Sequence, residues 1–129
     1  MGLTYHLRFK KVLPKKNELS ILIKNNKNDV VLVSDLYTTK YGYVNGDFDG
    51  QMIDLNLGNT SYISFDVLNK ESDSILRRKF VLNMVSKITK EIYPEEDYFF
   101  DLNGDFIFEK RENGVFKRNS NTDFYDGLN

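Results

Sequence analysis

The sequence predicts an α+β protein, with a mainly antiparallel sheet of about five to seven strands and two helices packed on one face. Short runs alternate apolar and polar residues, two segments have helical spacing, and aromatic-rich runs flank Asn-Gly pairs. Asn-Gly between apolar runs is a strong hairpin signal because both central residues of a type I′ turn have positive φ. Asn103-Gly104 and Asn113-Gly114 therefore predict a C-terminal three-stranded meander. A chain of 129 residues is expected to form a single domain over residues 1–129.

The N-terminal part predicts a strand, a helix and a second strand. Residues 3–9 alternate apolar and polar side chains, which is typical of a strand with one buried face. Pro14 fits the first turn of a helix, and apolar residues at helical spacing follow it, so we expect a helix over residues 14–24. Residues 30–33 form a β-branched run and predict a strand.

The middle of the chain is the least clearly patterned part. Residues 36–50 mix aromatic residues with glycines and fit either a hairpin or an irregular loop. Residues 52–57 and 60–67 both have strand character, and Gly58-Asn59 between them predicts a second hairpin.

The C-terminal half predicts a long helix before the meander. Residues 70–92 contain no Gly or Pro and carry apolar residues at spacings of three and four, which indicates a helix across the sheet. In the meander, a two-residue second turn would place Lys110 opposite Lys117 and cost stability. We therefore expect a bulged turn that pairs Glu109 with Lys117.

Composition excludes several classes of function. The 18 basic and 19 acidic residues give a net charge of -1, so nucleic-acid or membrane binding has no global positive charge to support it. The absence of cysteine excludes disulfides and thiolate sites, and His6 is the only histidine, which excludes two-histidine metal sites. No signal peptide or membrane span is recognisable, so we expect a cytoplasmic protein.

No residue set forms a recognisable catalytic, cofactor-binding or metal-binding constellation. Residues 101–105 resemble the start of a calcium loop, but the sixth position is Phe106 where a glycine is needed. The basic residues lack an RNA-recognition motif, and a nucleic-acid-binding domain is the disfavoured alternative. An enzyme would need carboxylates such as Asp54 or Asp66 to converge in a pocket, and a small-ligand or structural module would need a cavity between the long helix and the sheet.

Three segments carry a resemblance to a known family. They are LTYHLRFKKVLPKKNELSILI near the N-terminus, YISFDVLNKESDSILRRKFVLNMV, and LNGDFIFEKRENGVFKRN with the tail DFYDGL. Together they resemble the swarm-inhibition (Sit-type) immunity family, small bacterial proteins that neutralise a cognate polymorphic toxin. The resemblance implies a cytoplasmic α+β protein that occludes a toxin, without catalysis or a cofactor. Residues 36–50 have no counterpart in this pattern.

The same weakly patterned segment is the expected partner-binding surface. Functional residues concentrate on irregular segments held by a rigid scaffold, and aromatic anchors with a polar rim are typical of protein interfaces. An acidic rim also suits a basic partner. The oligomeric state is not predicted. The predicted partner-binding residues are Tyr37, Tyr41, Tyr43, Asp47, Phe48 and Asp49.

Overall fold

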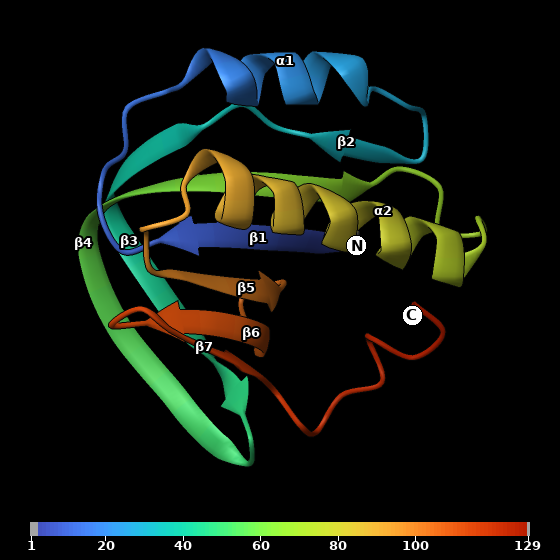
Figure 1. Cartoon of the computed structure of the whole chain (residues 1–129). Helices are drawn as coiled ribbons and strands as arrows, with labels where there is room; N and C mark the ends of the chain where they lie inside the picture. The colour runs from blue at the N-terminus through green and yellow to red at the C-terminus, as the bar shows by residue number, and fades with distance from the viewer. Residues whose placement is uncertain (1–2, 129) are drawn as a thin grey trace.

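The computed structural model describes residues 3–128 and confirms the α+β class, with two helices against a mainly antiparallel sheet of seven strands (Figure 1). A short π-helical turn, η1 (Ile88–Ile92), continues the second helix. The other elements are β1 (Thr4–Phe9), α1 (Asn17–Asn25), β2 (Val31–Val33), β3 (Tyr37–Phe48), β4 (Gln51–Val67), α2 (Ser74–Lys87), β5 (Tyr98–Leu102), β6 (Phe106–Glu112) and β7 (Val115–Arg118).

The strands pair in the order β1-β5-β6-β3-β4-β2, with β7 beside β6. Because β1 also pairs with β4, the strands β1, β5, β6, β3 and β4 form a closed ring of pairings. Its weakest link is β3 with β6, a parallel contact of one residue pair, Asp47 opposite Phe106. The ring therefore closes through a narrow seam.

The predicted C-terminal meander of β5, β6 and β7 is confirmed, but the expected bulge at its second turn is wrong. The turn has two residues, and Lys110 lies opposite Lys117. The Lys110 ammonium group escapes the repulsion because it contacts the Glu112 carboxylate and lies 5.0 Å from the centre of the Phe48 ring. The Asp97 carboxylate accepts both turn N–H groups, at 2.6 and 3.1 Å.

The hairpin expected at Gly58-Asn59 is also wrong. The segments 52–57 and 60–67 belong to one continuous strand, β4, and Gly58 with φ 66° forms a bulge within it. The chain reverses instead at Asp49 and Gly50, whose φ values of 54° and 80° match a type I′ turn. Residues 37–48 are therefore strand β3, neither a separate hairpin nor a loop.

Both helices begin later than the sequence predicts. The helix expected over 14–24 is α1, and the Pro14 carbonyl before it accepts a hydrogen bond from the Tyr93 hydroxyl. The helix expected over 70–92 starts at Ser74 because the Asp73 carboxylate caps the first turn.

Two hydrophobic cores lie on opposite faces of the central strands. The main core fills the space between the sheet and the helices, and includes Leu7, Leu19, Phe65, Val85 and Phe100, all with 0% exposure. The second core packs on the other face of β5 and β6, beneath the β3–β4 hairpin. Its buried residues are Val44, Phe48, Phe99 and Ile107, and Ile53, Leu55 and Leu57 pack against them.

The far half of the β3–β4 hairpin, residues 43–56, is termed the arm. It begins where Gly42 lies opposite Gly58 and the strand register shifts. In Figure 1 the hairpin curves round the left side of the sheet and reaches the bottom of the molecule, away from α1 and α2. The helices therefore leave the arm's outer face uncovered.

Candidate functional site

The outer face of the arm is built by strand register. Directly opposed residues of an antiparallel pair project to the same side. The register places Tyr43 opposite Asn56 and Asp47 opposite Met52, with Asn45 opposite Asp54 between them. Tyr43 is 45% exposed and Met52 is 67% exposed. These six residues, the outer face, combine an aromatic ring, a thioether, amides and two carboxylates.

One predicted contact residue, Phe48, lies on the inner face of the arm. Side chains alternate along β3, so Val44 and Phe48 point away from the outer face and enter the second core. Phe48 is only 6% exposed and its ring carries the Lys110 ammonium group. Phe48 holds the arm in place and is not available to a partner.

The structure separates the remaining predicted aromatic residues. Tyr37 pairs with Tyr62 on the opposite side of the sheet, with ring centroids 5.9 Å apart. The bulge at Gly42 lies between Tyr37 and Tyr43 and accounts for the change of side. Tyr41 lies at this bulge and is 85% exposed. The outer face therefore keeps Tyr43, with Tyr41 beside it, and loses Tyr37.

Asp49 occupies the tip of the arm and has a structural role. Its carboxylate accepts hydrogen bonds from the Ser120 backbone N–H at 2.6 Å and from the Ser120 hydroxyl at 2.8 Å. These bonds lower the pKa of Asp49, with a smaller contribution from nearby lysines. Asp49 links the arm to the C-terminal segment, while its charge still adds to the acidic tip.

Tyr43 and Asp54 form the polar centre of the outer face. The Tyr43 hydroxyl donates a hydrogen bond to the Asp54 carboxylate across the hairpin. This bond raises the pKa of Tyr43, so the ring remains a neutral hydrogen-bond donor. The pair orients an exposed aromatic ring next to a carboxylate, which is a favourable arrangement for a lysine or arginine side chain.

The charged residues of the chain segment that carries the outer face are all negative. Between Lys40 and Lys70 the sequence has four aspartates and no lysine or arginine. Three of them, Asp47, Asp49 and Asp54, lie on the arm or its turn. Sequence reasoning noticed these acids, but missed Met52 because its exposure depends on the register of β4 with β3.

His6 belongs to a separate polar group on the helix-free side of the sheet. As its strand predicts, it shares a face with Arg8, and the sequence did not reveal their partner, Asp101. Asp101 is 1% exposed and accepts hydrogen bonds from Arg8 Nε at 2.6 Å and from the Gly104 N–H at 3.1 Å. The His6 Nδ1 atom lies 3.4 Å from the same carboxylate without a hydrogen bond. This group ties β1 to β5 and to the first turn of the meander.

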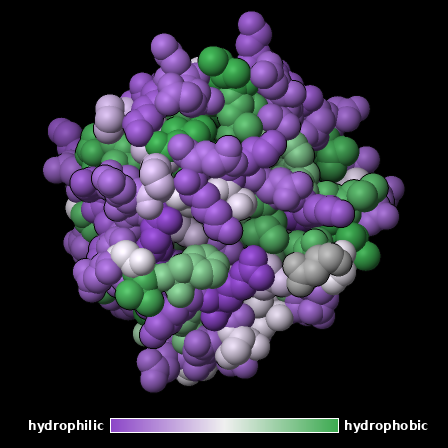
Figure 2. All heavy atoms as spheres, in the orientation of Figure 1, coloured by the Kyte–Doolittle hydropathy of each residue, from purple (hydrophilic) through white to green (hydrophobic). Residues whose placement is uncertain are grey.

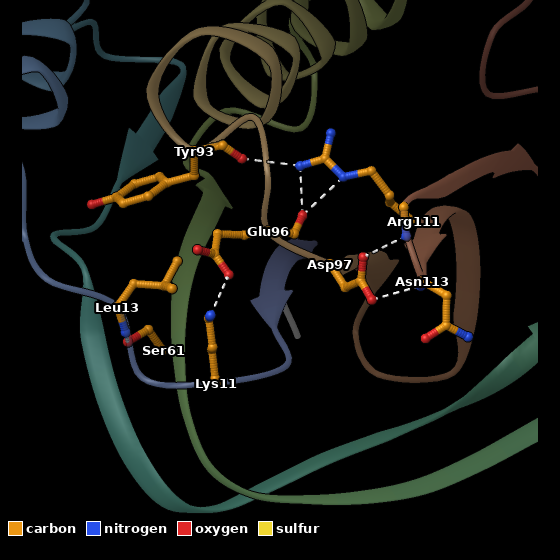
Figure 3. Close-up of polar contacts among 9 residues, drawn as sticks. Lys11, Leu13, Ser61, Tyr93, Glu96, Asp97, Arg111 and Asn113 are labelled. Carbon is orange, nitrogen blue, oxygen red and sulfur yellow. Dashed lines mark hydrogen bonds and ion pairs between the residues drawn. The ribbon is translucent and has the colours of Figure 1, made fainter.

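A second polar network closes the end of η1 (Figure 3). The Arg111 guanidinium donates to the backbone carbonyls of Thr89 in η1 and of Tyr93 and Glu96 just after it. The Glu96 carboxylate pairs with Lys11 at 3.2 Å. Every contact in this network satisfies a backbone group or a surface charge, so the network is structural.

The acids considered for an enzyme do not come together. Asp54 is bound to Tyr43 on the arm, whereas Asp66 accepts the Thr4 hydroxyl at 2.6 Å in the other half of β4. Within residues 3–128, no group of three or more His, Cys, Asp or Glu side chains is arranged to hold a metal ion. The small-ligand alternative needs a cavity between the long helix and the sheet, and the main core fills most of that space. A mainly apolar cavity of about 230 Å³ opens beside it, between the start of β2 and the first half of α2.

The helix-bearing side shows no single dominant patch. Figure 2 shows that hydrophilic residues cover much of it and divide the hydrophobic residues into several areas. Exposed apolar residues there include Ile21 on α1 and Leu76 on α2. In the described part of the chain, no helix is both long and apolar enough to cross a membrane.

No protein-family model matches the sequence, and no curated protein or solved structure matches it.

Proposed function

We propose that the protein is a cytoplasmic immunity-type inhibitor that binds a cognate bacterial toxin through the outer face of the arm and neutralises it by occlusion. The observation that carries the proposal is the exposed Tyr43 and Met52 side chains set among carboxylates on a face the helices leave uncovered. The sequence resemblance to immunity proteins supports the same class. On this proposal the chain itself catalyses no reaction.

The chemistry of the outer face defines the partner. Aromatic residues supply most of the binding energy at protein interfaces, and methionine adapts to irregular surfaces. Asp47, Asp49 and Asp54 would steer and orient a basic surface, such as one that a toxin uses to hold a nucleic acid. The same three charges repel a phosphate backbone, which argues against nucleic acid as the direct ligand.

The proposed interface extends beyond the outer face of the arm. A stable protein complex buries about 800 Å² on each partner, with strong contacts at the centre and a polar rim. The outer face with Tyr41 supplies the centre, and the polar residues along β3 and β4 supply the rim. Occlusion follows if this area covers the toxin's active surface.

The test uses a toxin domain encoded beside the gene, co-expressed with the chain and titrated by calorimetry. Tyr43→Ala is expected to weaken binding about tenfold or more, because it removes a central aromatic anchor. Asp54→Asn is expected to slow association and to flatten its salt dependence. Phe116→Ala is the matched control, since Phe116 is also an aromatic residue with 45% exposure but lies on β7.

Two results would overturn the proposal. One is the absence of binding or protection with the neighbouring toxin domain. The other is an equal loss of affinity in Tyr43→Ala and Phe116→Ala, which would place the interface elsewhere.

A further inference from the structure

The arm joins the rest of the sheet through a pair of opposed glycines. Gly42 lies opposite Gly58, and the register shifts on both sides of Gly42. Gly58 has φ 66°, and a Cβ atom at Gly42 would lie 2.6 Å from the Thr60 side chain. Because neither strand has a side chain at this level, both residues can change φ and ψ more freely than their neighbours, which is what a hinge requires.

The far end of the arm is attached only lightly to β6. The single paired residue there is Asp47, opposite Phe106, and the Asp47 N–H donates to the Asp105 carbonyl at 3.3 Å. Gly46 permits this approach, because a Cβ atom at that position would lie 3.1 Å from backbone atoms of Asp105 and Phe106. A single paired residue is a small attachment for a fourteen-residue arm (residues 43–56).

The side chain of Asn119 supplies the missing attachment. It is 3% exposed and lies in the seam between the arm and β6. Its Nδ2 donates to the Ile107 carbonyl at 2.8 Å and to the Asp47 carbonyl at 3.3 Å, so it bridges the two strands. Its Oδ1 accepts the Asp49 N–H at 3.2 Å. Together with the two hydrogen bonds from Ser120 to the Asp49 carboxylate, this buried amide attaches the arm where a full strand pair would have a ladder of hydrogen bonds.

Asn119 is itself held by a segment anchored away from the arm. Its backbone N–H donates to the Phe108 carbonyl at 2.8 Å. Beyond it, Phe124 is 3% exposed within the main core, and the Tyr125 hydroxyl donates to the Glu109 carboxylate at 2.8 Å. The C-terminal segment is thus fixed to the body of the protein, and Asn119 reaches from it to the arm.

The apolar contacts beneath the arm are few. The second core has four buried residues, and two of them, Phe99 and Ile107, remain with the body when the arm moves. The main core is much larger and lies on the other face of β5 and β6. Opening the arm therefore exposes far less apolar surface than global unfolding does, which is the condition for a separate opening transition.

From this geometry we propose that residues 43–56 form a hinged arm that turns about Gly42 and Gly58, and that Asn119 is the latch that holds it closed. Asn119 is then a positioning residue for the outer face. This functional role rests on the proposed function, whereas the hinge and latch do not. If the closed arm binds the partner, the fraction of closed arm scales the apparent affinity.

Amide hydrogen exchange in the free protein tests the latch directly. Asn119→Ala is expected to speed exchange in residues 43–56 about tenfold or more, because the side-chain hydrogen bonds to Asp47, Asp49 and Ile107 are lost, while β5 and α2 change much less. Asn121→Ala is the matched control, because it removes an exposed asparagine side chain from the same segment. Equal acceleration throughout the sheet, or none in the arm, would overturn the proposal.

A disulfide lock keeps the proposal testable if Asn119→Ala unfolds. The sequence has no cysteine, so Asp47→Cys with Phe106→Cys introduces one defined pair across the seam. Oxidation is expected to slow exchange in the arm relative to the reduced form of the same variant. Identical exchange in the two forms would show that the arm does not open separately.

The toxin titration separates this inference from the proposed function. A latch that behaves as described, with no toxin binding, leaves the hinge correct and the proposed function wrong. Toxin binding that is unchanged by Asn119→Ala, when exchange shows that the arm of the variant is open for most of the time, would refute the positioning role of Asn119.

Discussion

Replacing Gly46 with alanine tests how closely the arm approaches β6. The sequence Asn45-Gly46 looks like a turn, yet both residues lie inside β3. Gly46 is needed there because the added methyl group would lie 3.1 Å from the Asp105 carbonyl carbon, the Phe106 nitrogen and a side-chain carbon of Ile107. Carbon atoms in contact prefer about 3.5–4.0 Å, so one strand must retreat by several tenths of an ångström.

The structure sets the size of the effect. The neighbouring hydrogen bond from Asp47 to Asp105 is already 3.3 Å long, so a retreat of the arm breaks it. Overpacking a tight site costs about 1–3 kcal/mol, while Gly→Ala recovers about 0.4–1 kcal/mol by restricting the unfolded chain. The difference of the two midpoints lowers the free energy of unfolding by about 1.3 kcal/mol, within a range of about 0–2.6 kcal/mol.

Urea unfolding followed by circular dichroism measures this change as a lower midpoint. Asn45→Ala is the control, since Asn45 is the exposed neighbour and its replacement should stay within about 0.5 kcal/mol of the wild type. Amide exchange should show that the loss in Gly46→Ala is concentrated in residues 43–56. A Gly46→Ala variant more stable than the wild type would mean that the arm and β6 are not in close contact.

Two further predictions concern the tip and the underside of the arm. The pKa of Asp49 is lowered by its bonds from Ser120, so this contribution to stability is present above the unfolded pKa of about 3.9 and is lost as the pH falls through the lower folded value. The protection of the arm amides relative to their intrinsic exchange rates should therefore fall below about pH 4, and Asp49→Asn should remove that fall; wild-type protection that does not change with pH would contradict it. Phe99→Ala should lower the free energy of unfolding by about 3–5 kcal/mol because Phe99 is fully buried, whereas Tyr41→Ala, at an 85% exposed residue, should change it by less than about 0.5 kcal/mol. Chemical denaturation measures both, and similar losses in the two variants would contradict the placement of these side chains.

Local sequence signals predicted a turn correctly where no long-range strand pairing opposed it. The Asn103 and Asn113 turns formed as predicted because each connects two adjacent strands of a meander. Asn45-Gly46 has the same residues, but a turn there would break the long pairing between β3 and β4. The reversal occurs at Asp49-Gly50, another dipeptide that favours a type I′ turn. Local propensity thus gave several possible turns, and long-range pairing selected among them.

The sequence predicted which segment carries the candidate site, but not which of its side chains share the exposed face. Phe48 is buried because of which residues of β3 point inward, and Tyr37 lies on the other side of the sheet because of the register shift at Gly42. Both features depend on how β3 pairs with β4, which the sequence of β3 alone does not reveal. Asn119 could not be predicted either, because its side chain contacts Asp47, 72 residues away. An asparagine after a strand carries no signal that distinguishes a latch from an ordinary turn residue.

The charge of the arm connects its stability with the proposed binding. Asp47 and Asp54 lie on the same face, one diagonal step apart across the hairpin, so their like charges weaken the pairing of β3 with β4 within the arm of the free protein. A basic partner would relieve this repulsion as well as contact Tyr43, so part of the binding energy arises from the arm itself. Salt screens both effects, and it should therefore stabilise the pairing of β3 with β4 in the free arm while weakening the complex. This opposition distinguishes an acidic binding arm from a purely structural hairpin, in which salt would have no reason to act in two directions.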